Sequence, residues 1–437
     1  MKYEPLNALE LDTPVVARAP RLLAMLTRAF RSQFTNYLQV FAGTGVRLGL
    51  QAVYFFILAN TLSLHDMGVF ASASSTGIMI GCFSGLGFAS LAFRASAGKR
   101  RILGGYLAVF YASWLAALPL CLAASLPVFY FLFTSSLSLT AFLLIILVET
   151  GLWRIVEMIH QVNNGLGRFA SASLVISFGS ALRTAGAVVF AACGRHDVET
   201  WSAIYFAFNL AAMALAISVY QPRIKLRWRR QIFFGRVRDA LLFSVAYCAS
   251  IAQNEIDKLV MLALADQRTV GIYAISTRII DFTSVPIRSF FVLYSRKLII
   301  DGGQSNRIGR SLSVEMLIAL ISTAAMAALL VTLSIWPDLL GHNVAVATQL
   351  FGVLLAVPAF KNLLEYHSEL FFVYQRMTIR AVLATVLVGL KAAALALLLI
   401  HFDNIVQWGA WLNVVYLGLY VFSAASVYGS ISAGKNR

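Results

Sequence analysis

The chain is a succession of long apolar stretches separated by short polar segments. About 20 apolar residues in a helix are enough to cross the hydrocarbon core of a bilayer. Such runs recur at residues 36–60, 68–92, 103–125, 127–149, 171–193, 201–220, 240–265, 270–294, 312–336, 346–372, 381–401 and 408–430. The pattern predicts an all-α polytopic membrane protein with about 12 transmembrane helices. A minimal turn at Pro127 is expected between the third and fourth spans.

The polar segments divide the predicted helices into two groups of six. We expect a cytoplasmic N-tail, an N-terminal bundle, a cytoplasmic linker, a C-terminal bundle and a cytoplasmic C-tail, at 1–33, 34–220, 221–239, 240–430 and 431–437. The N-tail and the linker, which reads QPRIKLRWRRQIFFGRVRD, are both basic. All predicted outer loops are short, so no soluble domain is expected on either side of the membrane.

Composition supports this interpretation and excludes others. Of 437 residues, 59% are hydrophobic and 12% are charged, whereas a soluble domain carries about 25% charged residues. So little charge cannot cover a water-exposed surface, which excludes a soluble enzyme or a DNA-binding protein. The net charge of +16 therefore indicates contact with anionic membrane lipids or an anionic substrate, and no nucleic-acid partner is expected.

The distribution of basic residues predicts the orientation. With a cytoplasmic N-terminus, the inner loops and tails carry 26 Lys and Arg residues, and the outer loops carry only Arg195 and Arg268. Cytoplasmic loops of membrane proteins are enriched in Lys and Arg. We therefore expect both termini to lie in the cytoplasm.

The two halves resemble each other in sequence. Gly68, Phe70 and Ala71 match Gly271, Tyr273 and Ala274 at a constant offset of 203 residues. Six spans per half is an even number, so both halves have the same orientation. Parallel repeats related by an axis along the membrane normal are typical of transporters, and we expect the halves to surround a central cavity.

No catalytic or cofactor signature is present. The chain contains no GxxxxGK[ST] nucleotide-binding loop, and its four cysteines lack metal-ligand spacing. Asp197 and Glu199 are the acids of a seven-residue outer loop, too short for a catalytic domain. We expect no enzymatic activity, no metal and no cofactor.

Charged residues inside the predicted spans are the candidate functional residues. Seven are basic: Arg47, Arg183, Lys258, Arg278, Arg288, Lys361 and Lys391. Five acids share those spans: Glu255, Asp257, Asp281, Glu365 and Glu369. Each charge costs about 2.5–3.5 kcal/mol to insert, so these residues must face a wet cavity or one another. Because the cations outnumber the acids, a cation-lined cavity for an anion is predicted, in which Arg can hold phosphate bidentately.

Internal ion pairs are the alternative explanation for any one of these charges. Glu255 is placed to pair with Lys258, and Lys361 with Glu365. Glu365 and Glu369 are either protonatable coupling groups or partners of Lys361 and Arg376. Arg47, Arg183 and Lys391 have no acid in their own spans.

The chain resembles the polysaccharide-biosynthesis (Wzx-type) flippases of the multidrug/oligosaccharidyl-lipid/polysaccharide exporter superfamily. The resemblance rests on the two parallel halves, the Gly-φ-φ-Ala turn, and the stretch from Glu255 to Met261 before Gly271-Ile272-Tyr273. It implies alternating-access translocation of an undecaprenyl-pyrophosphate-linked oligosaccharide across the bacterial inner membrane, with polysaccharide polymerase machinery as a further partner. It also implies a substrate-binding cavity formed by Arg47, Arg183, Arg278, Arg288, Lys361 and Lys391.

Two other functions are weighed against this one. A multidrug exporter of the same fold exports cations and calls for an acidic cavity, which the excess of Arg and Lys disfavours. A polysaccharide polymerase or ligase calls for a long outer loop with catalytic residues, which the spacing of the spans does not provide.

Overall fold

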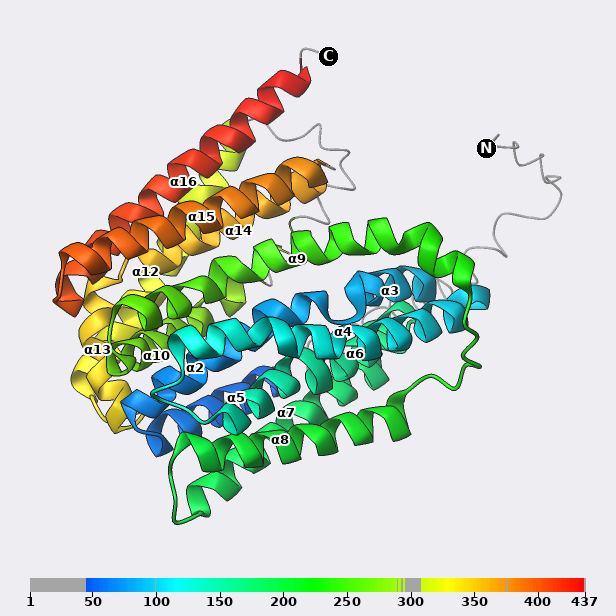
Figure 1. Cartoon of the computed structure of the whole chain (residues 1–437). Helices are drawn as coiled ribbons and strands as arrows, with labels where there is room; N and C mark the ends of the chain where they lie inside the picture. Colours follow the sequence, from blue (N-terminus) through cyan, green and yellow to red (C-terminus); the bar gives the residue numbers. More distant parts are fainter. Residues whose placement is uncertain are drawn as a thin grey trace, which may run out of the picture.

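The computed structural model describes residues 45–435 apart from 99, 289, 292, 293, 295–307 and 375, and these described residues form an all-helical protein (Figure 1). The predicted N-tail over 1–33 lies outside them. The elements are a helix over residues 45–61, α2 (Leu64–Ile80), η2 (Gly81–Gly87), α3 (Phe88–Gly98), η3 (Arg100–Ile102), α4 (Leu103–Leu132), α5 (Leu139–Leu147), η4 (Val148–Leu152), α6 (Trp153–Gly165), α7 (Phe169–Ala192), α8 (Val198–Leu215), η5 (Ala216–Tyr220), α9 (Arg230–Leu264), α10 (Gln267–Thr283), α12 (Ile308–Ile335), α13 (His342–Val353), α14 (Val357–Val373), α15 (Met377–His401) and α16 (Ile405–Lys435).

The prediction of an all-α polytopic membrane protein is confirmed. Within the described residues, eight helices are long and apolar enough to cross a membrane, or nine if α13 and α14, which meet at a 73° bend, count as one span. The expected number was about twelve. The difference falls on the first helix, whose predicted span begins before the described residues, on α9, which carries three charges in its last turns, and on α10, which has only 17 residues.

The predicted turn at Pro127, and with it a fourth span over 127–149, is wrong. The helix α4 continues through Pro127 to Leu132, because prolines are tolerated in apolar membrane helices. The next helical segment begins after Ser138, whose hydroxyl caps α5 by accepting a hydrogen bond from the backbone N–H of Ala141. The elements α5, η4 and α6 then form one continuous candidate span of 27 residues. Arg154, expected in an inner loop, therefore lies inside a span.

The two halves of the chain meet where α2 and α10 cross. A Cβ atom on Gly68 would lie 2.0 Å from the carbonyl oxygen of Gln267, and one on Gly271 would lie 1.9 Å from that of Leu64. Residues 64 and 267 are separated by the same 203 positions as the two glycines. The contact is thus reciprocal, as expected at an axis of pseudo-two-fold symmetry between parallel repeats.

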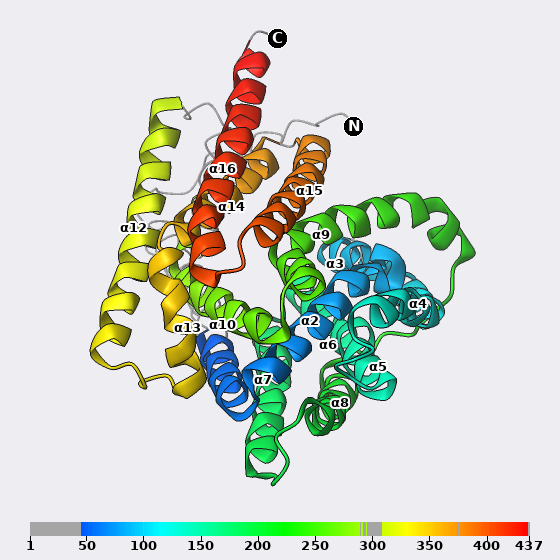
Figure 2. The ribbon, with the colours of Figure 1, turned by 60° about the vertical axis from the view of Figure 1, so that its left-hand side comes forward.

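The helix α9 lies between the two halves. It packs against α2 and η2 on one side and against α15 on the other. Figure 2 shows α12, α14, α15 and α16 to one side of α9 and α10, with α4, α5, α6 and α8 on the opposite side. Structurally, the predicted linker over 221–239 is extended only as far as Arg229, because α9 begins at Arg230.

Four helices begin at the same end of the molecule, and each is capped by a polar side chain. Side-chain caps begin the helices there: Ser63 caps α2, Ser138 caps α5, Asp197 caps α8 and Asp266 caps α10. The backbone N–H of Thr200 donates to the Asp197 carboxylate, which lowers the pKa of Asp197.

Two asparagines at this end connect the halves. The amide of Asn343 donates to the carbonyl oxygens of Ala59 and Leu62, each at 2.8 Å. The side-chain amide of Asn60 donates to the carbonyl oxygen of Leu340 at 2.8 Å. We call this end, with the connections 62–63, 133–138, 193–197, 265–266 and 336–341, the latched end.

We expect the latched end to face the periplasm. Alkaline phosphatase fused after His196 or Asp338 should be active, because these sites lie outside the cytoplasm. Green fluorescent protein fused at Lys225 or Lys435 should fluoresce, because these sites lie inside it. The reason is the enrichment of basic residues in the segments at the opposite end. The measurement is paired alkaline phosphatase and green fluorescent protein activity, and one reversed site would contradict the orientation.

Candidate functional site

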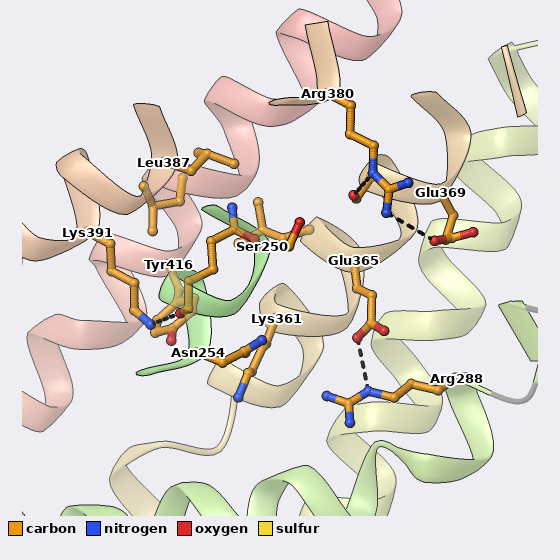
Figure 3. A pocket seen from close by; sticks show the side chains of 14 residues that line it. Ser250, Asn254, Arg288, Lys361, Glu365, Glu369, Arg380, Leu387, Lys391 and Tyr416 are labelled. Carbon is orange, nitrogen blue, oxygen red and sulfur yellow. Dashed lines mark hydrogen bonds and ion pairs between the residues drawn. The ribbon is translucent and has the colours of Figure 1, made fainter. Parts of the chain in front are cut away.

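Two cavities with charged walls lie on opposite faces of α9. The first, of about 460 Å³, is bounded by the helix over 45–61, α2, α6, α7, α9 and α10, and we call it the N cavity. The second, of about 340 Å³, lies among α9, α14, α15 and α16 (Figure 3), and we call it the C cavity. Glu255 and Lys258 of α9 face the N cavity, whereas Gln253 and Asn254 face the C cavity.

The N cavity carries more positive than negative charge. Its walls hold five cations and three carboxylates, at Arg47, Arg154, Arg183, Lys258, Arg278, Glu149, Glu157 and Glu255. Each carboxylate has a cationic partner. Glu255 lies 2.6 Å from Lys258 and Glu157 lies 2.9 Å from Arg154. Glu149 lies 4.0 Å from Arg183.

Arg183 is fixed in place by several neighbours. Its guanidinium lies over the Trp153 ring at 3.7 Å, a cation–π contact, and its Nε donates to Asn209 Oδ1 at 2.7 Å. Glu149, which accepts hydrogen bonds from Ser74 and Tyr205, lies beside it. This carboxylate belongs to the π-helical turn η4, a type of distortion that is frequent at functional sites. One nitrogen of Arg183, Nη2, is buried without a hydrogen bond.

Arg47 and Arg278 supply the excess charge of the N cavity. Neither makes an ion pair with another described residue, and the Nε of Arg47 is buried without a partner. The negative charge of Glu157 acts on Arg47, and so do the weaker positive charges of Arg183 and Arg278. Three guanidinium groups thus share one cavity, and two of them have no ion-pair partner among the described residues.

The C cavity is electrically balanced. Lys391 lies 2.6 Å from Asp257, and Lys361 lies 2.7 Å from Asp281. Figure 3 also shows Arg288 and Arg380 bonded to carboxylates of α14. These pairs join Arg288 to Glu365 at 3.1 Å and Arg380 to Glu369 at 3.5 Å. Every cation on the walls of this cavity therefore has an acidic partner.

The structure places all six predicted cavity cations on these walls, three in each cavity: Arg47, Arg183 and Arg278 in the first, and Arg288, Lys361 and Lys391 in the second. Their role in binding substrate stays a prediction. Among the expected pairs, Glu255 with Lys258 is confirmed.

Other expected pairings are wrong. Lys361 contacts Asp281 rather than Glu365, and Glu369 contacts Arg380 rather than Arg376. In each case the partner lies on another helix, so sequence spacing within one helix could not reveal it.

The sequence-based selection missed several charged residues of the membrane region. Arg154 and Glu157 were overlooked because the predicted fourth span ended at residue 149. Glu149, the last residue of that span, was left out because no Lys or Arg shared the span. The apolar run after Ser138 is the signal that would have corrected this error. Arg380 was assigned to an inner loop. Glu315, an acid inside the apolar run of α12, was passed over because no Lys or Arg shares that span.

Arg183 and Lys391 occupy equivalent places in the two halves. Each is the fifteenth residue of its helix, α7 or α15. Each also lies near a tyrosine ring of the next helix, Arg183 at 5.3 Å from Tyr205 and Lys391 at 5.2 Å from Tyr416. By contrast, the offset of 203 places Ser75 opposite Arg278. The uncompensated charge is therefore a feature of one cavity and not of the repeat.

Comparison with known proteins finds solved structures that are described as membrane transporters. No protein-family model and no curated protein sequence matches the chain. A solved structure described as the inward-facing conformation of a multidrug resistance MATE family transporter of the MOP superfamily superimposes with a TM-score of 0.62 at 14% identity, covering 90% of this chain and 98% of the other. The chain has the fold of the MOP-superfamily transporters. At this identity the likeness shows the fold alone.

Two further solved structures share this fold. A MOP superfamily transporter from Pyrococcus furiosus, whose description reports reverse polarity of its binding pocket, gives a TM-score of 0.56 at 13% identity over 92% of this chain and 96% of its own. A MATE transporter in complex with MaD3S gives 0.56 at 15% identity over 92% and 95%. Because the likeness to these structures shows the fold alone, the substrate class must be argued from the cavity.

Proposed function

We propose that this protein is a flippase that moves an undecaprenyl-pyrophosphate-linked oligosaccharide across the bacterial inner membrane by alternating access. The observation that carries the proposal is a pair of arginines in the N cavity, Arg47 and Arg278, that lie beside Arg183 and form no ion pair with another described residue. A guanidinium group presents a planar fork of donors that matches the oxygens of a phosphate. A diphosphate bears the charge that two free arginines can neutralise.

The alternating-access step follows from the arrangement of contacts between the halves. The latched end is closed by the Gly68–Gly271 contact and by the asparagine hydrogen bonds. Substrate would enter the N cavity from the opposite end, with its diphosphate against the arginines and its prenyl chain remaining in lipid. Opening of the latched end would then release it on the other side. No covalent bond is made or broken in this cycle.

The multidrug reading of the fold has less support from the cavity. A cationic drug needs a carboxylate whose charge is available, as burial of unpaired charge is costly. The three carboxylates of the N cavity each contact a cation already, and the two charged groups of this cavity that pair with no other described residue are both arginines. The reversed polarity in the description of the Pyrococcus furiosus transporter indicates that pocket charge varies within the fold.

Deletion of the gene in its bacterial host tests the function. We expect loss of one surface polysaccharide and accumulation of undecaprenyl-linked repeat units on the cytoplasmic leaflet. The control is the deletion strain with an intact copy of the gene restored at another chromosomal site. Normal polymer together with altered resistance to cationic drugs would contradict the proposal and favour the multidrug function. With purified protein, undecaprenyl pyrophosphate should raise the melting temperature, whereas undecaprenol should not.

A further inference from the structure

A carboxylate and an imidazole are buried together in the C-terminal half, away from both cavities. Glu315 of α12 is 3% exposed and His367 of α14 is 0% exposed. Their Oε1 and Nε2 atoms are 3.0 Å apart. Neither residue lines the N cavity or the C cavity, so the proposed binding of substrate does not account for them.

The hydrogen bonds around this pair come from α16. Tyr420 donates to Glu315 Oε2 at 2.7 Å, and Tyr428 contacts Glu315 Oε1. Ser423 Oγ lies 2.9 Å from His367 Nδ1. Three helices therefore converge on one carboxylate and one imidazole, and both oxygens of the carboxylate are satisfied without water.

Glu315 differs from the other carboxylates in the spans. Among the described residues, those others each contact a Lys or Arg: Glu149, Glu157, Glu255, Asp257, Asp281, Glu365 and Glu369. Glu315 has only His367. Lys and Arg keep their charge at physiological pH, but an imidazole gains or loses a proton near neutrality. The charge of this buried pair is therefore not fixed.

Both protonation states of the pair can be satisfied by hydrogen bonds. When His367 is neutral, Nε2–H can donate to Glu315 and Nδ1 can accept from the Ser423 hydroxyl. When it is protonated, Nδ1–H donates instead and the Ser423 hydroxyl rotates to accept. The first state has a net charge of −1 and the second is neutral. Burial disfavours the net charge, so the closed site retains its proton and releases it only where water reaches it.

No Lys or Arg among the described residues forms an ion pair with Glu315. On α14, Lys361, Glu365 and Glu369 are bonded to partners at the C cavity. Asp281 of α10 and Arg380 of α15 take part in those same pairs. His342 begins α13 at the latched end. On α16, the tyrosines Tyr416, Tyr420 and Tyr428 are neutral phenols.

A chain of hydroxyl groups leads away from the pair. Tyr428 also reaches Ser311 Oγ at 3.0 Å, and Ser311 lies 3.0 Å from the hydroxyl of Tyr366. Ser311 belongs to the first turn of α12, which begins at residue 308. Hydroxyl groups both donate and accept, so a proton can shift along this chain as far as Ser311 and Tyr366, which are themselves buried.

We propose that Glu315 and His367 form a proton-binding site that takes up and releases one proton in each transport cycle. The exchanged species is a single proton, passed to or from water with no change of covalent bonds between heavy atoms. Movement of α12 or α16 relative to α14 would break the cluster and admit water. The inference rests on a transport function for the chain but not on the identity of the substrate.

Nitrogen-15 histidine NMR of the full-length protein in lipid nanodiscs tests the site directly. The chain has six histidines, and His367 is assigned from the spectrum of His367→Gln. We expect His367 to titrate in the wild type, and in Glu315→Gln its midpoint should move at least one pH unit lower, because the carboxylate that favours the imidazolium is gone. The exposed His401 is the internal control and should not move.

Two results would overturn the proposal. One is a His367 signal that keeps one protonation state from pH 4 to pH 9 in the wild type. This measurement does not depend on the folding of any variant. The other is an unchanged His367 midpoint in Glu315→Gln.

A transport measurement complements the spectra. Glu315→Gln should abolish polymer export at normal abundance, whereas Asp239→Asn, at an exposed carboxylate of α9, should export normally. If gene deletion leaves polysaccharide unchanged, the proposed substrate fails while the NMR result still decides the proton site. Normal export by Glu315→Gln would remove its role in the cycle.

Discussion

Replacing Gly271 with alanine will open the latched end of the molecule. The added Cβ would lie 1.9 Å from the carbonyl oxygen of Leu64, far inside van der Waals contact, and that atom belongs to a helical backbone which cannot rotate away. The helices α2 and α10 must separate. Overpacking of this kind costs about 1–3 kcal/mol. Gly68→Ala should act in the same way, because its Cβ would lie 2.0 Å from the oxygen of Gln267.

A matched substitution separates this effect from a general one. Gly389 lies in α15 with no atom within 4 Å of an added Cβ. Alanine there should stabilise the helix, by up to about 1 kcal/mol, through its higher helix propensity. The melting temperature should therefore fall in Gly68→Ala and Gly271→Ala, and it should stay unchanged or rise in Gly389→Ala.

Opening can be measured by chemical labelling. A cysteine introduced at Leu340, beside the contact with Asn60, should react with a membrane-impermeant maleimide several-fold faster in the Gly271→Ala background than in the wild type. Equal labelling rates and equal melting temperatures would show that the two helices tolerate a methyl group between them. The reciprocal glycine contact would then not hold the halves together.

The sequence predicted the features that recur along the chain, and it also drew attention to charged residues inside apolar helices. Apolar run length indicated the membrane helices, and the offset of 203 residues picked out Gly68 and Gly271 before their contact was known. Charge inside an apolar run singled out six cations, and all six line one of the two cavities, while their role in binding substrate stays a prediction. These signals are local or periodic, so a single sequence carries them.

The sequence did not show which acid pairs with which cation when the two residues lie on different helices. Lys361 has Glu365 one turn away on its own helix but bonds Asp281, which lies 80 positions earlier in the chain. Which of two acids wins depends on how α10 packs against α14, and sequence spacing does not report that. The error at Pro127 had another cause. Proline usually ends a helix in water, but within α4 the apolar surroundings keep the helix intact on both sides of it.

Removing Arg47 or Arg278 should separate binding from stability. Neither residue has an ionic partner among the described residues, so Arg47→Ala and Arg278→Ala leave no carboxylate unpaired there, and the protein should reach the membrane at wild-type abundance. Polymer export should nevertheless fall steeply. A hydrogen bond to a charged group contributes about 1.5–3 kcal/mol, which corresponds to about a 10- to 150-fold loss of affinity for the diphosphate. Lysine at either position should restore part of it, since charge returns without the bidentate fork.

The opposite outcome is expected for a paired charge. Asp257→Asn leaves Lys391, which is only 3% exposed, without the carboxylate that lies 2.6 Å from its Nζ. Breaking a buried pair by removing one partner costs about 3–5 kcal/mol, so this variant should lose abundance as well as export. Membrane abundance and polymer export measured together in all three variants distinguish the two kinds of charge. If Arg47→Ala and Arg278→Ala export normally at full abundance, these two arginines do not bind substrate. Loss of a guanidinium that held the diphosphate would have weakened substrate binding and lowered export.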